Sequence, residues 1–258
     1  MGIWQATPQA TPPLSNSPIA SLSNYSLMAN LLKTYGQPAV YRVIHPLILG
    51  LAKAGVTPNT ITLIGFLLNI GVAVVFVHGA GQPRMDLSYV GWGGALILFA
   101  GLFDMMDGRL ARVSGTSSKF GALFDSVLDR YSELVMFLGI CFYLVSHHYF
   151  LSSLFAFLAM IGSMMVSYVR ARAEGLGIEC SDGLMQRPER IVLIGVSAVL
   201  CGLVQGWAGP FRYVCPDTDF PLLENITVFT FPIFVLALLA NYTAWQRLQH
   251  CKRVLNDE

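Results

Sequence analysis

The stretch "DMMDGRLARVSGTSSKFGALFDSVLD" (residues 104–129) carries four aspartates and two arginines between two long apolar runs. The run before it reads "GWGGALILFAGLF" (91–103), and the run after it reads "RYSELVMFLGICFYLV" (130–145). Apolar runs of this kind are typical of helices that cross a bilayer. The stretch therefore predicts a helical hairpin whose charged turn lies at one face of a membrane.

The composition of the whole chain is that of an integral membrane protein. Of its 258 residues, 54% are hydrophobic and only 12% are charged, whereas soluble domains carry about 25% charged residues. The net charge of +1 gives no indication of nucleic acid binding. The five cysteines form no CxxC pair, which argues against a zinc site or a disulfide framework.

Six segments are long and apolar enough to span the membrane as helices. Helices are expected because every backbone polar group must be satisfied within its own segment in lipid. The predicted spans cover residues of about 59–79, 88–113, 119–145, 150–172, 188–206 and 226–246. We therefore predict an all-α integral membrane protein with six transmembrane helices.

The segments outside these helices have distinct characters. Residues 1–24 are rich in Pro, Ser, Thr and Asn, lack the features of a signal peptide, and are expected to form a disordered tail. Residues 25–57 include apolar positions at helical spacing and predict an N-terminal interfacial amphipathic helix. The predicted transmembrane domain is 58–250, and a cytoplasmic tail follows at 251–258.

The distribution of lysine and arginine predicts the orientation. When the loops are assigned alternately to the two faces, 13 of the 16 basic residues fall on one side and two on the other, with Arg130 inside a helix. Basic residues favour the cytoplasmic side of a membrane. Both termini and the charged hairpin at 104–129 are therefore predicted to be cytoplasmic.

The spacing of the four aspartates predicts that they converge. Asp104 and Asp107 are three residues apart and Asp125 and Asp129 are four apart, so each pair shares one helix face. The turn at 114–118 allows the two helices to run antiparallel with these faces opposed. Two divalent cations would neutralise four carboxylates, and hard oxygen ligands indicate Mg²⁺, Mn²⁺ or Ca²⁺. A divalent-cation transporter is the alternative function, because intramembrane acids also mark ion pathways.

The same residues form a longer pattern, D-x2-D-G-x2-A-R-x8-G-x3-D-x3-D. It is filled by Asp104, Asp107, Gly108, Ala111, Arg112, Gly121, Asp125 and Asp129. This pattern is the signature of the CDP-alcohol phosphotransferase family, which the chain resembles over residues of about 38–250. The resemblance implies a membrane enzyme that uses an alcohol to displace CMP from a CDP-linked lipid such as CDP-diacylglycerol.

The resemblance also implies roles for individual residues. The four aspartates of the pattern would hold two Mg²⁺ or Mn²⁺ ions, and Asp129 would act as the general base. The residues implied to contact the CDP-lipid are Asn59, Thr62, Gly108, Arg112, Ser118 and Gly121. For Asn59 and Thr62, capping of a helix N-terminus is the alternative interpretation. A homodimer is implied as well.

Residues 167–195, "SYVRARAEGLGIECSDGLMQRPERIVLIG", resemble one branch of the family. That branch makes phosphatidylinositol phosphate from CDP-diacylglycerol and inositol phosphate, which implies a bacterial inner membrane location. Two of its three acceptor-phosphate residues match Arg170 and Arg190, with Arg187 as an alternative register, and the third has no match. Inositol phosphate is thus the predicted acceptor. Free inositol, glycerol phosphate or another polar alcohol are the alternatives, and orientation charge is the other interpretation of these arginines.

Overall fold

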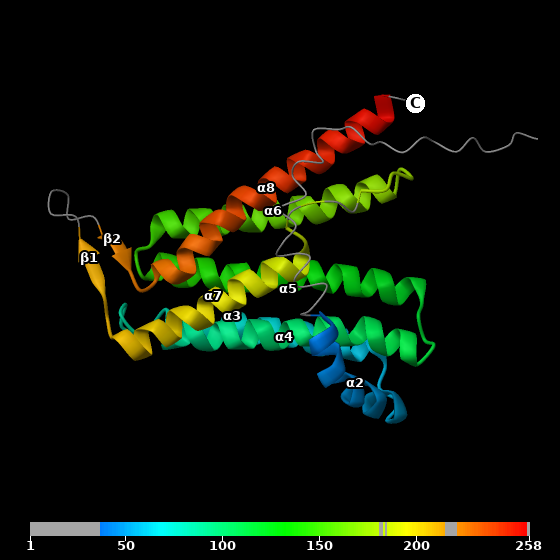
Figure 1. The fold of residues 1–258 in the computed structure, drawn as a ribbon, viewed down its shortest axis with the longest axis horizontal. Coiled ribbons are helices and arrows are strands. Elements are labelled where there is room, and N and C mark those ends of the chain that lie inside the picture. Colours follow the sequence, from blue (N-terminus) through cyan, green and yellow to red (C-terminus); the bar gives the residue numbers. More distant parts are fainter. Residues whose placement is uncertain (1–36, 181–182, 184, 215–220, 257–258) are drawn as a thin grey trace, which may run out of the picture.

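A bundle of long helices forms the protein, with a short helix beside one end and two short strands at the other (Figure 1). The computed structural model describes residues 37–180, 183, 185–214 and 221–256, so the predicted tail at 1–24 lies outside the described residues. In chain order the elements are α2 (Gln37–Lys53), α3 (Pro58–Gly79), α4 (Ser88–Val113), α5 (Lys119–Ser146), α6 (Phe150–Glu174), α7 (Arg187–Ala208), β1 (Arg212–Val214), β2 (Pro221–Glu224) and α8 (Thr227–Asn256).

Five helices have the length and composition of membrane spans, namely α3, α4, α6, α7 and α8. The prediction of a helical, multi-pass membrane protein is therefore confirmed at this level. Helix α5 is also long enough, at 28 residues. Its composition differs from that of the other five helices, because Asp129, Arg130 and Glu133 extend its charged part toward its middle.

Local sequence signals explain where the helices begin. Helix α3 starts with Pro58 after the N-cap residue Thr57, whose side chain accepts a hydrogen bond from the Thr60 backbone N–H (3.3 Å). Helix α5 starts after Ser118, whose hydroxyl oxygen accepts one from the Gly121 N–H (2.9 Å). Helices α3 to α7 have the bounds predicted for the first five segments to within two residues. The last helix instead continues to Asn256, through most of the predicted tail.

The packing of the helices leaves α4 and α5 apart. Helix α3 packs against both of them, α4 packs against α7, and α6 packs against α8 and α5, whereas α4 and α5 share at most marginal contact along their described lengths. Small residues bring α4 and α7 close: a Cβ on Gly91 would lie 3.1 Å from the Gly202 Cα, and one on Gly94 would lie 2.6 Å from the Ala198 Cβ. Helix α3 thus contacts both halves of the charged hairpin, and α7 packs against its first half.

Helix α2 docks at the end of the bundle that carries the charged hairpin (Figure 1). Its side chains Ile44 and Ile48 are buried in an apolar cluster with residues of α3 and α4. The guanidinium carbon of Arg109, on α4, lies 3.3 Å from the centroid of the Tyr41 ring. This cation–π contact gives Arg109 a partner within the chain.

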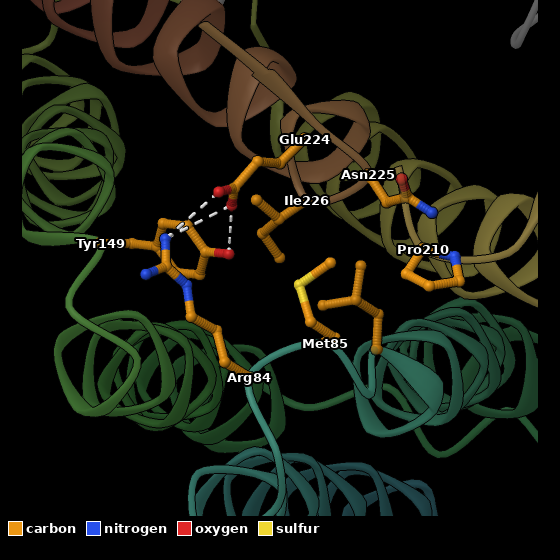
Figure 2. Close-up of a pocket in the computed structure, with 8 residues that line it drawn as sticks. Arg84, Met85, Tyr149, Pro210, Glu224, Asn225 and Ile226 are labelled. Carbon is orange, nitrogen blue, oxygen red and sulfur yellow. Dashed lines mark hydrogen bonds and ion pairs between the residues drawn. The ribbon is translucent and has the colours of Figure 1, made fainter. Parts of the chain in front are cut away.

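The opposite end of the bundle is held by a polar network around the buried carboxylate of Glu224 (Figure 2). This carboxylate accepts hydrogen bonds from the Tyr149 hydroxyl (2.5 Å) and from Arg84 (3.4 Å), and Arg212 Nε lies 3.0 Å from it. Burial raises the pKa of Tyr149 to about 12, so its phenol remains a proton donor at neutral pH. The network joins the loop before α4, the residue before α6, and the two strands.

We expect Tyr149→Phe to lower the thermal unfolding midpoint of the detergent-solubilised protein. The variant removes one hydrogen bond to a buried carboxylate, and bonds to charged groups contribute about 1.5–3 kcal/mol. Tyr168→Phe is the matched control, because Tyr168 is exposed on α6. Equal midpoints for the two variants would show that the Tyr149 hydroxyl does not stabilise this end of the bundle.

Candidate active site

The structure brings the four predicted aspartates together from two helices. Asp104 and Asp107 lie near the end of α4, and Asp125 and Asp129 lie in the first half of α5. Their charges interact across the space between the helices: Asp104 and Asp107 both interact with Asp125, and Asp129 interacts with Asp104 and Asp125. Like charges this close repel unless cations lie nearby, so the neighbouring arginines are central to the site.

Arg187, the first residue of α7, binds two of these carboxylates. Its Nη2 lies 2.9 Å from Asp104 Oδ2 and its Nη1 lies 2.7 Å from Asp129 Oδ1. The three side chains are only 19%, 13% and 14% exposed, so solvent screens the contact weakly. One guanidinium therefore bridges α4 and α5 across the site.

Helix α3 positions the aspartates of α4. The Thr62 hydroxyl donates to Asp107 Oδ2 at 2.9 Å. A Cβ on Gly65 would lie 3.2 Å from Asp104 Oδ1, so the absence of a side chain there lets α4 approach. The capping interpretation of Asn59 and Thr62 is not realised, because the cap is Thr57. Thr62 instead orients a carboxylate of the site.

A cavity of about 340 Å³ opens beside the aspartates. It is bounded by the start of α3, the end of α4, the turn after α4 and the start of α5, and Asp107 and Asp125 line it. Five of the six residues predicted to contact the CDP-lipid also line it, namely Asn59, Thr62, Gly108, Ser118 and Gly121. The carboxylates of Asp107 and Asp125 in its lining suit divalent cations together with a charged head group.

The two glycines of the cavity have different surroundings. A Cβ on Gly108 would meet nothing within 4 Å, so this position faces open space. A Cβ on Gly121 would lie 3.0 Å from the Ser118 hydroxyl oxygen and 3.4 Å from Asn59 Oδ1, so here glycine lets the start of α3 approach α5. The sixth predicted contact residue, Arg112, is exposed and does not line the cavity.

The three arginines predicted to bind an acceptor phosphate have different ion-pair partners in the structure. Arg170 is exposed and pairs with Glu174 on its own helix (2.8 Å). Arg190 is 1% exposed, and its Nε and Nη2 donate to the two carboxylate oxygens of Glu133 at 2.9 and 3.3 Å. Among these three, Arg187 is the residue that contacts the aspartates.

Glu133 is a residue that the sequence analysis did not identify. It follows Asp129 by four residues, as Asp129 follows Asp125, so the three acids share one face of α5. This spacing, in an otherwise apolar helix, was the available signal. Its carboxylate fixes Arg190, which in turn donates to the Met185 carbonyl (3.2 Å) just before α7.

The donor chemistry of the site fits divalent cations. Within the described residues, His, Cys, Asp and Glu side chains form no group of three or more already spaced around one ion; two of the four aspartates have Arg187 as their partner. The carboxylates and the Thr62 hydroxyl are nonetheless all oxygen donors, which Mg²⁺ and Mn²⁺ prefer. Two arginines lie beside these four aspartates: Arg187, and Arg130 at 3.9 Å from Asp129. The acidic groups of the site therefore outnumber its basic groups.

Fold and site together define a multi-pass membrane enzyme whose polar site is built on one helical hairpin. Residues 55–216 match the family model of CDP-alcohol phosphatidyltransferases. The chain belongs to this family, which confirms the resemblance seen in its sequence. The family does not support the alternative of a divalent-cation transporter.

Two relatives with named activities are similar to this chain in sequence. The chain is 33% identical over 162 residues to a phosphatidylinositol phosphate synthase of Mycobacteroides abscessus, covering 62% of this chain and 70% of that protein. It is 34% identical over 171 residues to an archaetidylinositol phosphate synthase of Methanothermobacter thermautotrophicus, covering 66% and 79% of the two chains.

Two solved structures of one such enzyme are similar to this chain in fold. The crystal structure of Mycobacterium tuberculosis phosphatidylinositol phosphate synthase with CDP-DAG bound matches with a TM-score of 0.64 and 25% identity, over 81% of this chain and 94% of that one. The same enzyme in complex with manganese and citrate matches with a TM-score of 0.61 and 26% identity, over 80% and 87% of the two chains.

We expect a large loss of stability when the buried ion pair of Glu133 and Arg190 is broken. Glu133→Gln leaves the Arg190 charge buried without its counter-ion, and breaking one partner of such a pair costs about 3–5 kcal/mol. The double variant Glu133→Leu, Arg190→Met should recover most of this loss in thermal unfolding of the solubilised protein.

The exposed pair of Arg170 and Glu174 is the matched control, because both side chains are about half exposed. Arg170→Gln should cost less than about 1 kcal/mol. A similar loss from Glu133→Gln and Arg170→Gln would contradict the assignment of Glu133 and Arg190 as a pair that holds the start of α7.

Proposed function

We propose that the protein transfers the phosphatidyl group of CDP-diacylglycerol to inositol phosphate and releases CMP. The observation that carries the proposal is the cavity of about 340 Å³, whose lining includes five residues of the family pattern, namely Asp107, Gly108, Ala111, Gly121 and Asp125. Relatives named phosphatidylinositol phosphate synthase and the similar structure with CDP-DAG bound support this donor and acceptor. Free inositol and glycerol phosphate are the alternative acceptors.

We assign the four aspartates as ligands of two divalent ions, Mg²⁺ or Mn²⁺. A similar enzyme has been solved with manganese, and the oxygen donor set of this chain fits such ions. When bound, the ions would neutralise charge on the pyrophosphate and on the departing CMP. Thr62 would hold Asp107 in place for this role through its 2.9 Å hydrogen bond.

The remaining groups position the reactants. Asn59, Ser118 and the open backbone at Gly108 would contact the CDP group inside the cavity, where Thr62 and Gly121 also lie. We propose that Arg112, which is exposed, contacts the same group from outside the cavity lining.

Asp129 would take the proton of the attacking hydroxyl as general base. The contact of its Oδ1 with Arg187 shows that its carboxylate is directed toward the other acids of the site. This orientation matters because a general base must lie within hydrogen-bonding distance of the proton that it accepts.

We propose that Arg170 and Arg187 bind the phosphate of the acceptor. Arg187 reaches the aspartates, and Arg170 lies near the end of α6 with an exposed guanidinium. Arginine suits this role because its planar group contacts phosphate oxygens in pairs. We assign Arg190 a positioning role instead, since its guanidinium is buried against Glu133.

The arrangement in the membrane is part of the proposal. We propose that α5 is a sixth span, that α2 lies at the interface, and that both termini and the aspartates are on the cytoplasmic side of a bacterial inner membrane. Basic residues concentrated on that side support this orientation. We also propose a homodimer, with a tail at 1–24, an interfacial segment at 25–57, a transmembrane domain at 58–250 and a short segment at 251–258.

The reaction is tested by CMP release from CDP-diacylglycerol with Mg²⁺ or Mn²⁺ and each acceptor in turn. We expect turnover with inositol phosphate, and its loss in Asp129→Asn with the fold intact. Asp86→Asn is the control, because Asp86 lies at the opposite end of the bundle, where its carboxylate accepts hydrogen bonds from the Ser88 N–H and hydroxyl. Near-normal turnover of Asp129→Asn would exclude it as the base. Absence of CMP release with inositol phosphate, inositol, glycerol phosphate and serine would refute the proposed reaction.

The acceptor assignment is tested by Arg170→Ala. We expect the KM for inositol phosphate to rise about tenfold, which corresponds to about 1.4 kcal/mol, while the KM for CDP-diacylglycerol stays the same. Arg172→Ala is the control, since Arg172 is exposed on the same end of α6. An unchanged KM for inositol phosphate would leave Arg170 as a charge that sets membrane orientation.

A further inference from the structure

Arg187 occupies carboxylate oxygens of the candidate metal site. It lies 2.9 Å from an oxygen of Asp104 and 2.7 Å from an oxygen of Asp129, and it comes from a third helix. Opposite charges at these distances attract each other, and the low exposure of the three side chains leaves this attraction weakly screened. Arg187 therefore acts as a counter-ion for two of the four acids.

The position of Arg187 is fixed by the start of α7. Arg190, three residues later, is held by both carboxylate oxygens of Glu133 on α5 and by the Met185 carbonyl. The Gln186 backbone N–H also donates to the Glu189 side chain (2.9 Å), which closes a capping box at the same point. The helix start is thus anchored to α5, and this anchor directs Arg187 toward the aspartates.

We propose that Arg187 is a resident cation of this site that competes with divalent ions for Asp104 and Asp129, so that ion binding releases its guanidinium from these carboxylates. The inference rests on the proposed function, which places divalent ions at the four aspartates. A guanidinium in contact with a carboxylate oxygen obstructs an ion at that oxygen, and its positive charge repels the ion through a weakly screened region.

This competition has a consequence for binding order. A guanidinium released from the aspartates is available to the phosphate of the acceptor, so ion binding and acceptor binding strengthen each other. Such coupling is reciprocal between the two ligands. Arg187 thus links occupancy of the metal site to recognition of an anionic acceptor.

The test measures Mn²⁺ binding to the purified full chain without either substrate, from the paramagnetic resonance signal of free Mn²⁺. Arg187→Gln removes the charge, and Arg187→Lys keeps it. Arg172→Gln is the control, because it removes an exposed positive charge at the same end of the bundle. All proteins are purified with Mn²⁺ and titrated from a chelating buffer, so a variant that needs the ion to stay folded still yields a Kd.

We expect Arg187→Gln to bind Mn²⁺ at least fivefold more tightly than the wild type, and Arg187→Lys and Arg172→Gln to remain within twofold of it. An unchanged or weaker Kd in Arg187→Gln overturns the proposal, and so does an equal gain in Arg187→Lys, because the gain would then not depend on charge. Wild-type protein that binds no Mn²⁺ would instead remove the metal assignment on which the inference rests. The reaction itself is judged separately by CMP release.

Discussion

Four carboxylates on two helices share one small region of a largely apolar bundle, and their mutual repulsion is the constraint on which the rest of the site depends. Positive charges beside the carboxylates offset this repulsion. Arg187 contacts Asp104 and Asp129, and Arg130 lies near Asp129. The two helices that carry the acids do not pack against each other closely. Helix α3 packs against both of them, and α7 packs against α4 and reaches α5 through Arg187 and Arg190.

The same requirement, that a buried charge has a partner, applies elsewhere in the molecule. Glu133 and Arg190 neutralise each other beside the site, and Glu224 is surrounded by Arg84, Arg212 and Tyr149 at the other end. Each of these groups joins elements that are distant in sequence. The polar ends of the bundle therefore provide specific contacts, while the middle relies on apolar packing and on small residues such as Gly91 and Gly94.

Helix α5 shows how site and fold depend on each other. Asp125, Asp129 and Glu133 lie on one of its faces, and these charges give it a less apolar character than the other long helices. Asp129 and Glu133 pair with Arg187 and Arg190 at the start of α7, so the helix is polar where it faces the site. Its second half contributes Met136, Phe137, Ile140 and Tyr143 to the apolar core. One helix thus forms part of the acidic site and part of the core.

The sequence by itself determined the helices and the hairpin pattern. Apolar runs and caps are local features, so the predicted bounds of the first five spans agree with the structure to within two residues. The spacing of the aspartates, Gly108 and Gly121 is local as well. Five of the six residues that the family resemblance implied for the CDP-lipid lie around one cavity, and three of them, Gly108, Ser118 and Gly121, come from this hairpin.

Only the tertiary structure decided which side chains are partners across helices. Thr62 meets Asp107 from 45 residues away, and Arg190 meets Glu133 from 57 residues away. Sequence spacing could not distinguish the role of Arg187 from that of Arg190, because both are arginines in the first turn of α7. Their different roles arise from helix packing, which directs one guanidinium to the aspartates and buries the other against Glu133. Partner choice depends on the relative placement of whole helices, which no local pattern records.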